Sequence, residues 1–323
     1  MPAGPGREVK FAAGIQGNAQ SEVAPTVFLP HSGSDFGRMI EYKDNEDALG
    51  VRDKRINQVK LRDYGKGPIA GNVDIDTLMW LYQNVFGNAG VSASSGNIRT
   101  ITFAKPTPGA SRPYNTLYCV EPNVNEKFVG GVMDKLELMW ATDSWMKYTS
   151  EWTTLKAETN TTALPSVPDS ILFAPSGTKL ESAQNVAGLS AGLENEVKSV
   201  KITISNETEP YPKLNSTEFA SIPSKGLMID IEIVALFKGF VERNKWIANA
   251  FESLRLTADA ERARGAHDVI TQQVLQFNKV KYGEFKPGRS LDSLMEQTIN
   301  AKAYYDPSSS QEKTLSGIIR TNT

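Results

Sequence analysis

Most of the chain alternates between apolar and polar residues with a period of two, which is typical of half-buried β-strands. The clearest case is residues 227–238, LMIDIEIVALFK, where Asp230 and Glu232 lie on the face opposite to the isoleucines. Residues 135–140 and 197–205 alternate in the same way. We therefore predict a mainly β fold. Its sheet core is expected to contain the inward residues of these strands: Leu136, Leu138, Trp140, Ile202, Ile204, Ile229, Ile231 and Ile233.

One stretch, GNVDIDTLMWLYQNVFG at residues 71–87, has the period of a helix. Asp76 is expected to cap this helix, which would begin at Thr77, and Gly87 is expected to end it in a left-handed conformation. A single apolar stripe would face the sheet, so we predict a flanking helix whose core residues are Leu78, Leu81, Tyr82, Val85 and Phe86.

A helical period returns at Ile247, Ala250, Phe251 and Leu254, directly after the strand at 227–238. Because a strand is again followed by a short helix, we predict two weakly similar halves, at about residues 61–157 and 196–305. Residues 158–195 are rich in Ser, Thr, Ala, Gly and Pro and are expected to form a long crossover with one or two short strands.

Residues 1–60 are rich in Gly, Pro and charge and are expected to form an N-terminal arm and loop, leaving residues 61–323 as the main β domain. Gly65, Gly67 and Pro68 indicate a turn after a short strand, and residues 88–97 indicate a loop. A further turn, or one turn of helix, is expected at Leu291–Met295. The other predicted strands are Thr26–Leu29, Arg38–Tyr42, Gln58–Asp63, Ile98–Phe103, Leu117–Val120, Trp145–Leu155, Val269–Lys281, Gln297–Tyr305 and a short one at Ile318 and Ile319.

The composition limits the possible partners and the compartment. With 35 Lys and Arg against 37 Asp and Glu, the net charge of −2 provides no general attraction to nucleic acid or to an anionic membrane. The single cysteine, Cys119, excludes an internal disulfide and is expected to be a half-buried hydrophobic residue. The longest apolar run, IVALF, is far shorter than the roughly 20 residues of a membrane helix. We expect assembly in the cytoplasm, without a membrane.

The sequence contains little material for catalysis. Only two histidines, His31 and His267, occur, so neither a catalytic triad nor a zinc site is expected. GIQGN at residues 14–18 lacks the third glycine and the strand and helix of a dinucleotide-binding loop. We therefore expect no enzyme activity, no cofactor and no metal.

The order of several motifs resembles that of the tail tube, or major tail, proteins of long-tailed bacteriophages. The motifs are the 71–87 stretch, then VMDKLELMW before an aromatic, Thr-rich strand, then VKSVKITISNETEP, and finally the strong strand at 227–238. The resemblance covers roughly residues 60–305 and rests on the order of the motifs, because no single one is diagnostic.

This resemblance implies a structural virion protein with a β-sandwich or barrel element, short flanking helices, an arm and long loops. It implies rings, hexameric or trimeric with a pseudo-sixfold wall, that stack into a tube through which DNA passes during ejection without specific binding. It also implies contacts with other tail proteins such as the tape measure, terminator and tip proteins. Asp230 and Glu232 are candidates for the lumen, where we expect more acidic than basic residues.

A second interpretation is a carbohydrate- or receptor-binding β-sandwich of a phage tail or adhesin. Four aromatic residues, Trp140, Trp145, Tyr148 and Trp152, could stack on a sugar, although strand spacing favours a core role. An enzyme is the third and weakest interpretation.

Overall fold

The computed structural model describes residues 8–45, 57–87, 90–95, 98–104, 112–189, 197–236, 241–263, 270–287, 295–306 and 315–322. Strands account for 65% of the described residues and helices for 9%, so the predicted mainly β fold is confirmed. In chain order the elements are β1 (Lys10–Gln16), β2 (Val27–Leu29), β3 (Gly33–Ser34), β4 (Gly37–Asn45), β5 (Asn57–Asn72), α1 (Ile75–Phe86), β6 (Val91–Ser95), β7 (Ile98–Ala104), β8 (Tyr114–Val120), β9 (Asn125–Ala141), β10 (Ser144–Thr153), β11 (Lys156–Thr159), β12 (Phe173–Ala183), a 3₁₀ turn (Val186–Gly188), β13 (Val197–Ser205), β14 (Tyr211–Pro212), β15 (Phe219–Ser221), β16 (Met228–Leu236), α2 (Val241–Ile247), β17 (Phe251–Ala263), β18 (Ile270–Pro287), β19 (Glu296–Ala303) and β20 (Ser316–Asn322).

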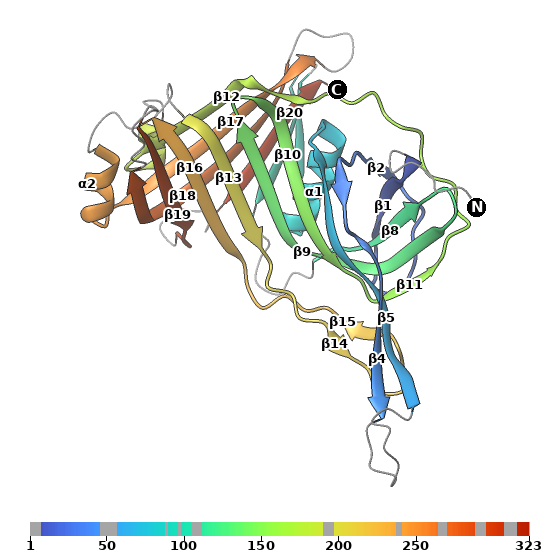
Figure 1. Cartoon of the computed structure of the whole chain (residues 1–323). Helices are drawn as coiled ribbons and strands as arrows, with labels where there is room; N and C mark the ends of the chain where they lie inside the picture. The colour runs from blue at the N-terminus through green and yellow to red at the C-terminus, as the bar shows by residue number, and fades with distance from the viewer. Residues whose placement is uncertain are drawn as a thin grey trace.

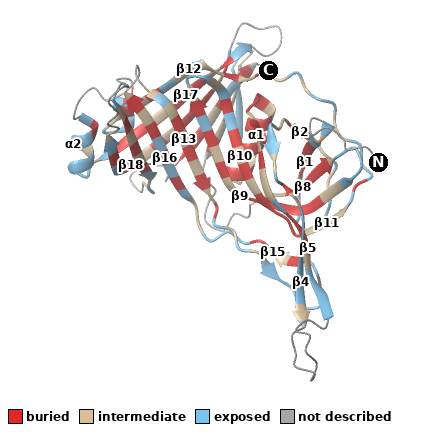
Figure 2. Ribbon diagram, viewed as in Figure 1, coloured by how far each residue is buried: buried red, intermediate tan, exposed pale blue. Residues whose placement is uncertain are grey.

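One antiparallel sheet organises the molecule (Figure 1). Its central strands lie in the order β5, β10, β9, β13, β16, β19 and β18. The long strand β18 connects two layers, because its C-terminal half pairs with β19 while its N-terminal half pairs with β17 and β20. β12 extends this second layer beyond β17, and β7 and β6 extend it beyond β20. Most of these strands contribute residues to one large buried cluster, and Figure 2 marks the buried positions in red.

A smaller lobe lies at the other end of the long strand β9. There β9 pairs with β8 and β11, and β8 pairs with β1. The segment expected to form an arm thus contributes strands to the fold in its described part. Phe11 on β1 and Leu29 on β2 are 2% and 0% exposed, so β1 and β2 share the core of the molecule.

The strand β5 corrects one prediction. The sequence suggests a short strand followed by a turn at Gly65, Gly67 and Pro68, but β5 runs without interruption for 16 residues. The glycines serve close packing instead: a Cβ on Gly71 would lie 2.1 Å from the backbone oxygen of Pro30, and Gly67 has a φ of 137°. Glycine-rich sequence therefore marks the place where the segment before β4 crosses this strand.

The first helix lies where the sequence places it, with a corrected start. α1 begins at Ile75 and its cap is Asp74, not Asp76: the Asp74 side chain accepts a 2.7 Å hydrogen bond from the N–H of Thr77. Gly87 ends the helix with a φ of 72°, as predicted. The helix contacts β2, β7 and β9 and so closes one side of the core.

The second helix is also displaced from its prediction. α2 covers Val241–Ile247, and Phe251 and Leu254 belong to the strand β17. Asn249, with a φ of 55°, redirects the chain between them. The helical spacing of Ile247, Phe251 and Leu254 therefore does not reflect one helix, because these residues belong to a short helix and to the strand that follows it.

Two predicted loops contain more structure than expected. Residues 91–95 form β6, which pairs with β7, and the crossover at 158–195 carries the 11-residue strand β12. The paired strands predicted at 135–140 and 145–155 are present as the β9–β10 hairpin. His267 and all but Met295 of the turn predicted at Leu291–Met295 lie outside the described residues.

Candidate functional site

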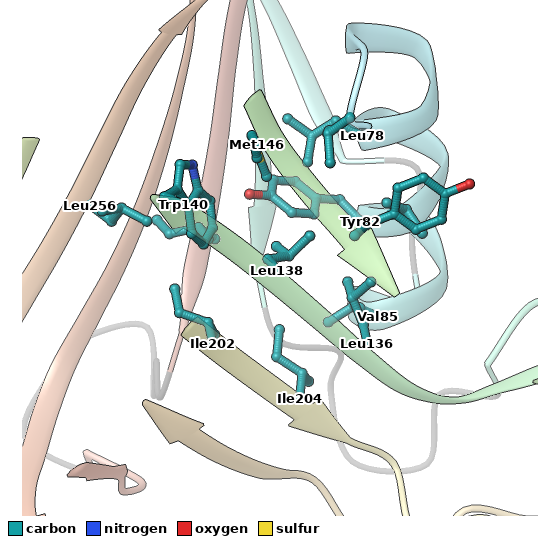
Figure 3. Close-up of a cluster of buried hydrophobic side chains, with 14 of the residues drawn as sticks. Leu78, Tyr82, Val85, Leu136, Leu138, Trp140, Met146, Ile202, Ile204 and Leu256 are labelled. Carbon is teal, nitrogen blue, oxygen red and sulfur yellow. The ribbon is translucent and has the colours of Figure 1, made fainter. Parts of the chain in front are cut away.

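The residues predicted for the core lie together in the interior. Those of α1 (Leu78, Leu81, Tyr82, Val85 and Phe86) are at most 2% exposed, and those of β9, β13 and β16 (Leu136, Leu138, Trp140, Ile202, Ile204, Ile229, Ile231 and Ile233) at most 3%. Figure 3 shows the α1 side chains facing those of β9. All belong to one cluster, so they hold α1 against the sheet and leave the opposite face of the central strands free to make other contacts.

That opposite face carries Asp230 and Glu232, both exposed on β16. In the sheet, Lys201 of β13 lies opposite Glu232 and Lys302 of β19 lies opposite Asp230. The two acidic residues therefore lie between lysines of the neighbouring strands, and with Trp246 these side chains border a shallow depression of about 700 Å³.

Lysines and acidic residues are interspersed on this outward face. Those on the described parts of β10, β9, β13, β16, β19 and the end of β18 include Lys147, Glu151, Lys135, Glu137, Lys201, Asp230, Glu232, Glu296, Lys302, Lys281, Glu284 and Lys286. Glu137 forms ion pairs with Lys135 at 2.6 Å and Lys201 at 3.0 Å. Partial burial raises the pKa of Glu137, but these two lysines outweigh it and the pKa is lowered. This face therefore carries charges of both signs in similar number.

A two-stranded hairpin, β4 with the first half of β5, projects from the body of the molecule (Figure 1). Its base is fixed by Arg38, whose Nε and Nη2 atoms donate to the two carboxylate oxygens of Asp63 at 2.7 and 2.6 Å. Lys60 also pairs with Asp63, and the Tyr64 hydroxyl donates to Glu41 at 2.6 Å. The hairpin therefore leaves the sheet in a defined direction.

Beyond this base, the hairpin exposes large apolar side chains. The residues concerned are Met39, Ile40, Tyr42, Val59 and Leu61, of which Val59 is 59% exposed. Two strands alone are marginally stable in water, and exposed apolar groups of this kind mark contact surfaces. The sequence does not distinguish these residues, because on a strand they follow the same alternation as core residues.

The described residues form no recognisable metal site or reactive cluster of side chains. No group of three or more His, Cys, Asp or Glu side chains is placed to hold a metal ion there. Burial raises the pKa of the Cys119 thiol to about 12, which leaves it protonated and unreactive near neutral pH. The Nε2 atom of His31 lies 2.6 Å from the backbone oxygen of Val9, a structural contact. No described helix is long and apolar enough to cross a membrane.

The aromatic residues that could form a sugar platform are mostly inside the protein. Trp140, Tyr148 and Trp152 are at most 3% exposed, and Trp152 stacks on Trp80 of α1 with ring centroids 5.0 Å apart. Only Trp145 of the four is substantially exposed, at 39%. A single accessible ring does not make a stacking platform.

Comparison with known proteins agrees with the resemblance seen in the motifs. A search of curated protein sequences gives no match. The profile of a family described as phage tail tube protein matches residues 65–303, which is more than half of the chain and includes α1, the β9–β10 hairpin and the strand β16. Members of this family are structural components of the virion tail. The chain belongs to the phage tail tube protein family.

Proposed function

We propose that copies of this chain assemble into rings, that the rings stack into the tail tube, and that DNA passes through the central channel during ejection. The family match supports a tube subunit, and the projecting β4–β5 hairpin is the observation that supports stacking. Rings with hexameric symmetry, or trimeric rings with a pseudo-sixfold wall, are the two candidates. The tape measure, terminator and tip proteins are the expected partners at the ends of the tube, and assembly is expected in the host cytoplasm.

The hairpin is suited to reach a neighbouring ring. It is held rigidly at its base by Asp63, and beyond that base it exposes apolar side chains that a second subunit would cover. Contact between rings would also remove the exposed edges of β4 and β5, which otherwise invite uncontrolled pairing with other chains.

Negative-stain electron microscopy of the purified protein tests this function. The wild-type protein should form tubes, whereas the variant Tyr42→Ser, Val59→Ser should form rings or smaller species, because it removes the exposed apolar groups of the hairpin. Val91→Ser is the matched control, since Val91 is 75% exposed on the distant strand β6. Wild-type protein that remains globular under all assembly conditions would refute the tube function.

A further inference from the structure

The helix α2 is oriented in an unusual way. Its one buried residue is Glu242, which is 4% exposed, while the apolar residues Val241, Trp246 and Ile247 are 67%, 37% and 56% exposed. A surface helix normally turns its apolar stripe toward the core and its charges toward water. In α2 the buried position is acidic, while Val241 and Ile247 are directed away from the protein and Trp246 is partly exposed.

Polar contacts hold α2 in this orientation. The Lys245 ammonium lies 3.1 Å from a carboxylate oxygen of Glu242 and 3.5 Å from one of Glu252, which is 3% exposed on β17. The indole N–H of Trp246 donates to the backbone oxygen of Gly283 at 3.2 Å, and its ring stacks on Phe285. The exposed side of the helix is therefore fixed in position before any partner arrives.

Aromatic and basic residues continue the apolar surface beside α2. Phe251 is 42% exposed, with the Lys279 ammonium 4.3 Å and the Lys281 ammonium 5.4 Å from its ring centroid, and it meets Tyr304 edge-on at 5.9 Å. Phe251 lies opposite Lys281 on β18, two residues before the Gly283 that holds Trp246. Two residues of strand span roughly 7 Å, so the β18 positions that contact the two rings lie close together. We call this surface the α2 knob: Trp246, Ile247, Phe251, Tyr304, Lys279 and Lys281.

The smaller lobe presents a hollow with complementary properties. A depression of about 880 Å³ is lined by Val9, Phe11, His31, Phe36 and Glu121, together with the segment 32–34. Glu121 is the one carboxylate among the lining residues, and the exposed residues Glu8, Lys10 and Asp35 are next to lining residues in the chain. We call this hollow the N-terminal depression. Its apolar lining residues and Glu121 suit a partner that is aromatic and basic.

We propose that the α2 knob of one copy docks into the N-terminal depression of a second copy, an inference that rests on the proposed tube function. The knob carries lysines around an aromatic ring, and the depression combines three apolar residues with the carboxylate of Glu121. The two surfaces lie at opposite ends of the molecule in Figure 1, with α2 on one side and β1 and β8 on the other. A contact between two different surfaces is head-to-tail, and it closes into a ring when the rotation per subunit permits.

Two complementary variants test the contact. Phe251→Ala, Lys281→Glu removes an exposed ring of the knob and reverses the charge of one of its lysines; neither residue is buried. Gly33→Trp, Glu121→Lys fills the depression, where a Cβ on Gly33 would meet no atom within 4 Å, so that folding is preserved. Lys179→Glu, an exposed charge reversal on β12, is the control. Thermal unfolding checks the fold of each protein, and analytical ultracentrifugation measures its assembly.

Each variant alone should remain monomeric, with self-association at least about tenfold weaker than that of the wild type, while Lys179→Glu assembles normally. An equimolar mixture of the two variants should form dimers and nothing larger, because one intact knob and one intact depression remain. Variants that assemble like the wild type, or a mixture that stays monomeric, would overturn the contact while wild-type tubes preserve the proposed function. Wild-type protein that forms neither rings nor tubes would overturn both.

Discussion

At the scale of single residues, the α1 cap is a charge held inside the protein. Asp74 is 3% exposed and its pKa is raised, chiefly by burial. Asp74→Ala removes the acceptor of the Thr77 N–H and should lower the free energy of unfolding by about 1 kcal/mol. Asp74→Asn keeps an acceptor oxygen without the cost of a buried charge, so its stability at pH 7 should equal or exceed that of the wild type. Urea unfolding measures the free energy of unfolding of both variants. An Asn variant as unstable as the Ala variant would show that an acceptor oxygen at this position does not suffice.

At the hairpin base, the pKa of Asp63 is lowered, whereas that of Asp74 is raised. The hydrogen bond from Arg38 lowers the pKa of Asp63, and Lys60 adds to the effect. Asp63 therefore contributes stability that is fully present above its unfolded pKa of about 3.9 and is lost as the pH falls through its lower folded value. The free energy of unfolding, measured between pH 6 and pH 2, should fall less steeply in Asp63→Asn than in the wild type. Equal slopes would show that the pair does not contribute.

Two neighbouring aspartates show what sequence alone leaves open at this scale. Asp74 and Asp76 both precede the apolar stripe of α1, and either has the chemistry of a cap. Asp74 acts as the cap in the folded chain, where its carboxylate also accepts a hydrogen bond from Ser170 at 3.4 Å, almost one hundred residues away. The type of element was predictable from local pattern, and its first residue depended on a distant segment.

At the scale of elements, α1 is the helix on which the core closes. Leu81 is 0% exposed within the large cluster, so Leu81→Asp buries a carboxylate among apolar side chains, without water or a cation to stabilise its charge. The variant should lose several kcal/mol of stability and fail to accumulate as folded protein. Gln83→Asp, on a half-buried position of the same helix, is the control and should fold. Folded, assembly-competent Leu81→Asp protein would refute the role given to the stripe.

At this scale, the strands that the sequence predicts well are those with a strong alternation of apolar and polar residues. The strands around Leu138, Ile202 and Ile231 are predictable because most of their inward residues are large and apolar and most of their outward residues are polar. β5 was broken in the prediction because Gly65, Gly67 and Gly71 have no side chain to carry a pattern. The reason for these glycines lies in other segments: residues 30–36 occupy the space beside Gly67 and Gly71, and the ring of Phe128 occupies the space beside Gly65.

At the scale of the whole molecule, the family was recognisable from the sequence and the assembly surfaces were not. The order of the motifs can be read directly from the sequence, and the family profile covers nearly the same region. The hairpin and the α2 knob instead depend on which apolar residues remain uncovered after folding. Val59 and Phe251 look like core residues in the sequence, and only the three-dimensional structure shows that they are exposed.

The charge of the outward sheet face leads to a prediction for the assembled tube. An acidic excess was expected near Asp230 and Glu232, yet on the described strands of this face the lysines balance the acids. A neutral wall also lets a polyanion pass, because it offers no net release of counterions on binding. If this face lines the channel, wild-type tubes should hold short duplex DNA weakly even at low salt.

Asp230→Lys, Glu232→Lys makes the same face strongly basic and should retain duplex DNA inside the tube. Retention should weaken steeply with salt, since each neutralised phosphate contributes a slope of about −0.9 in log affinity against log salt. Protection of the DNA from nuclease distinguishes the lumen from the outer surface, which a nuclease can reach. Asp169→Lys, Glu209→Lys is the control, because both residues are exposed elsewhere and the change in charge is the same. Salt-sensitive binding without protection would place Asp230 and Glu232 on the outside of the tube.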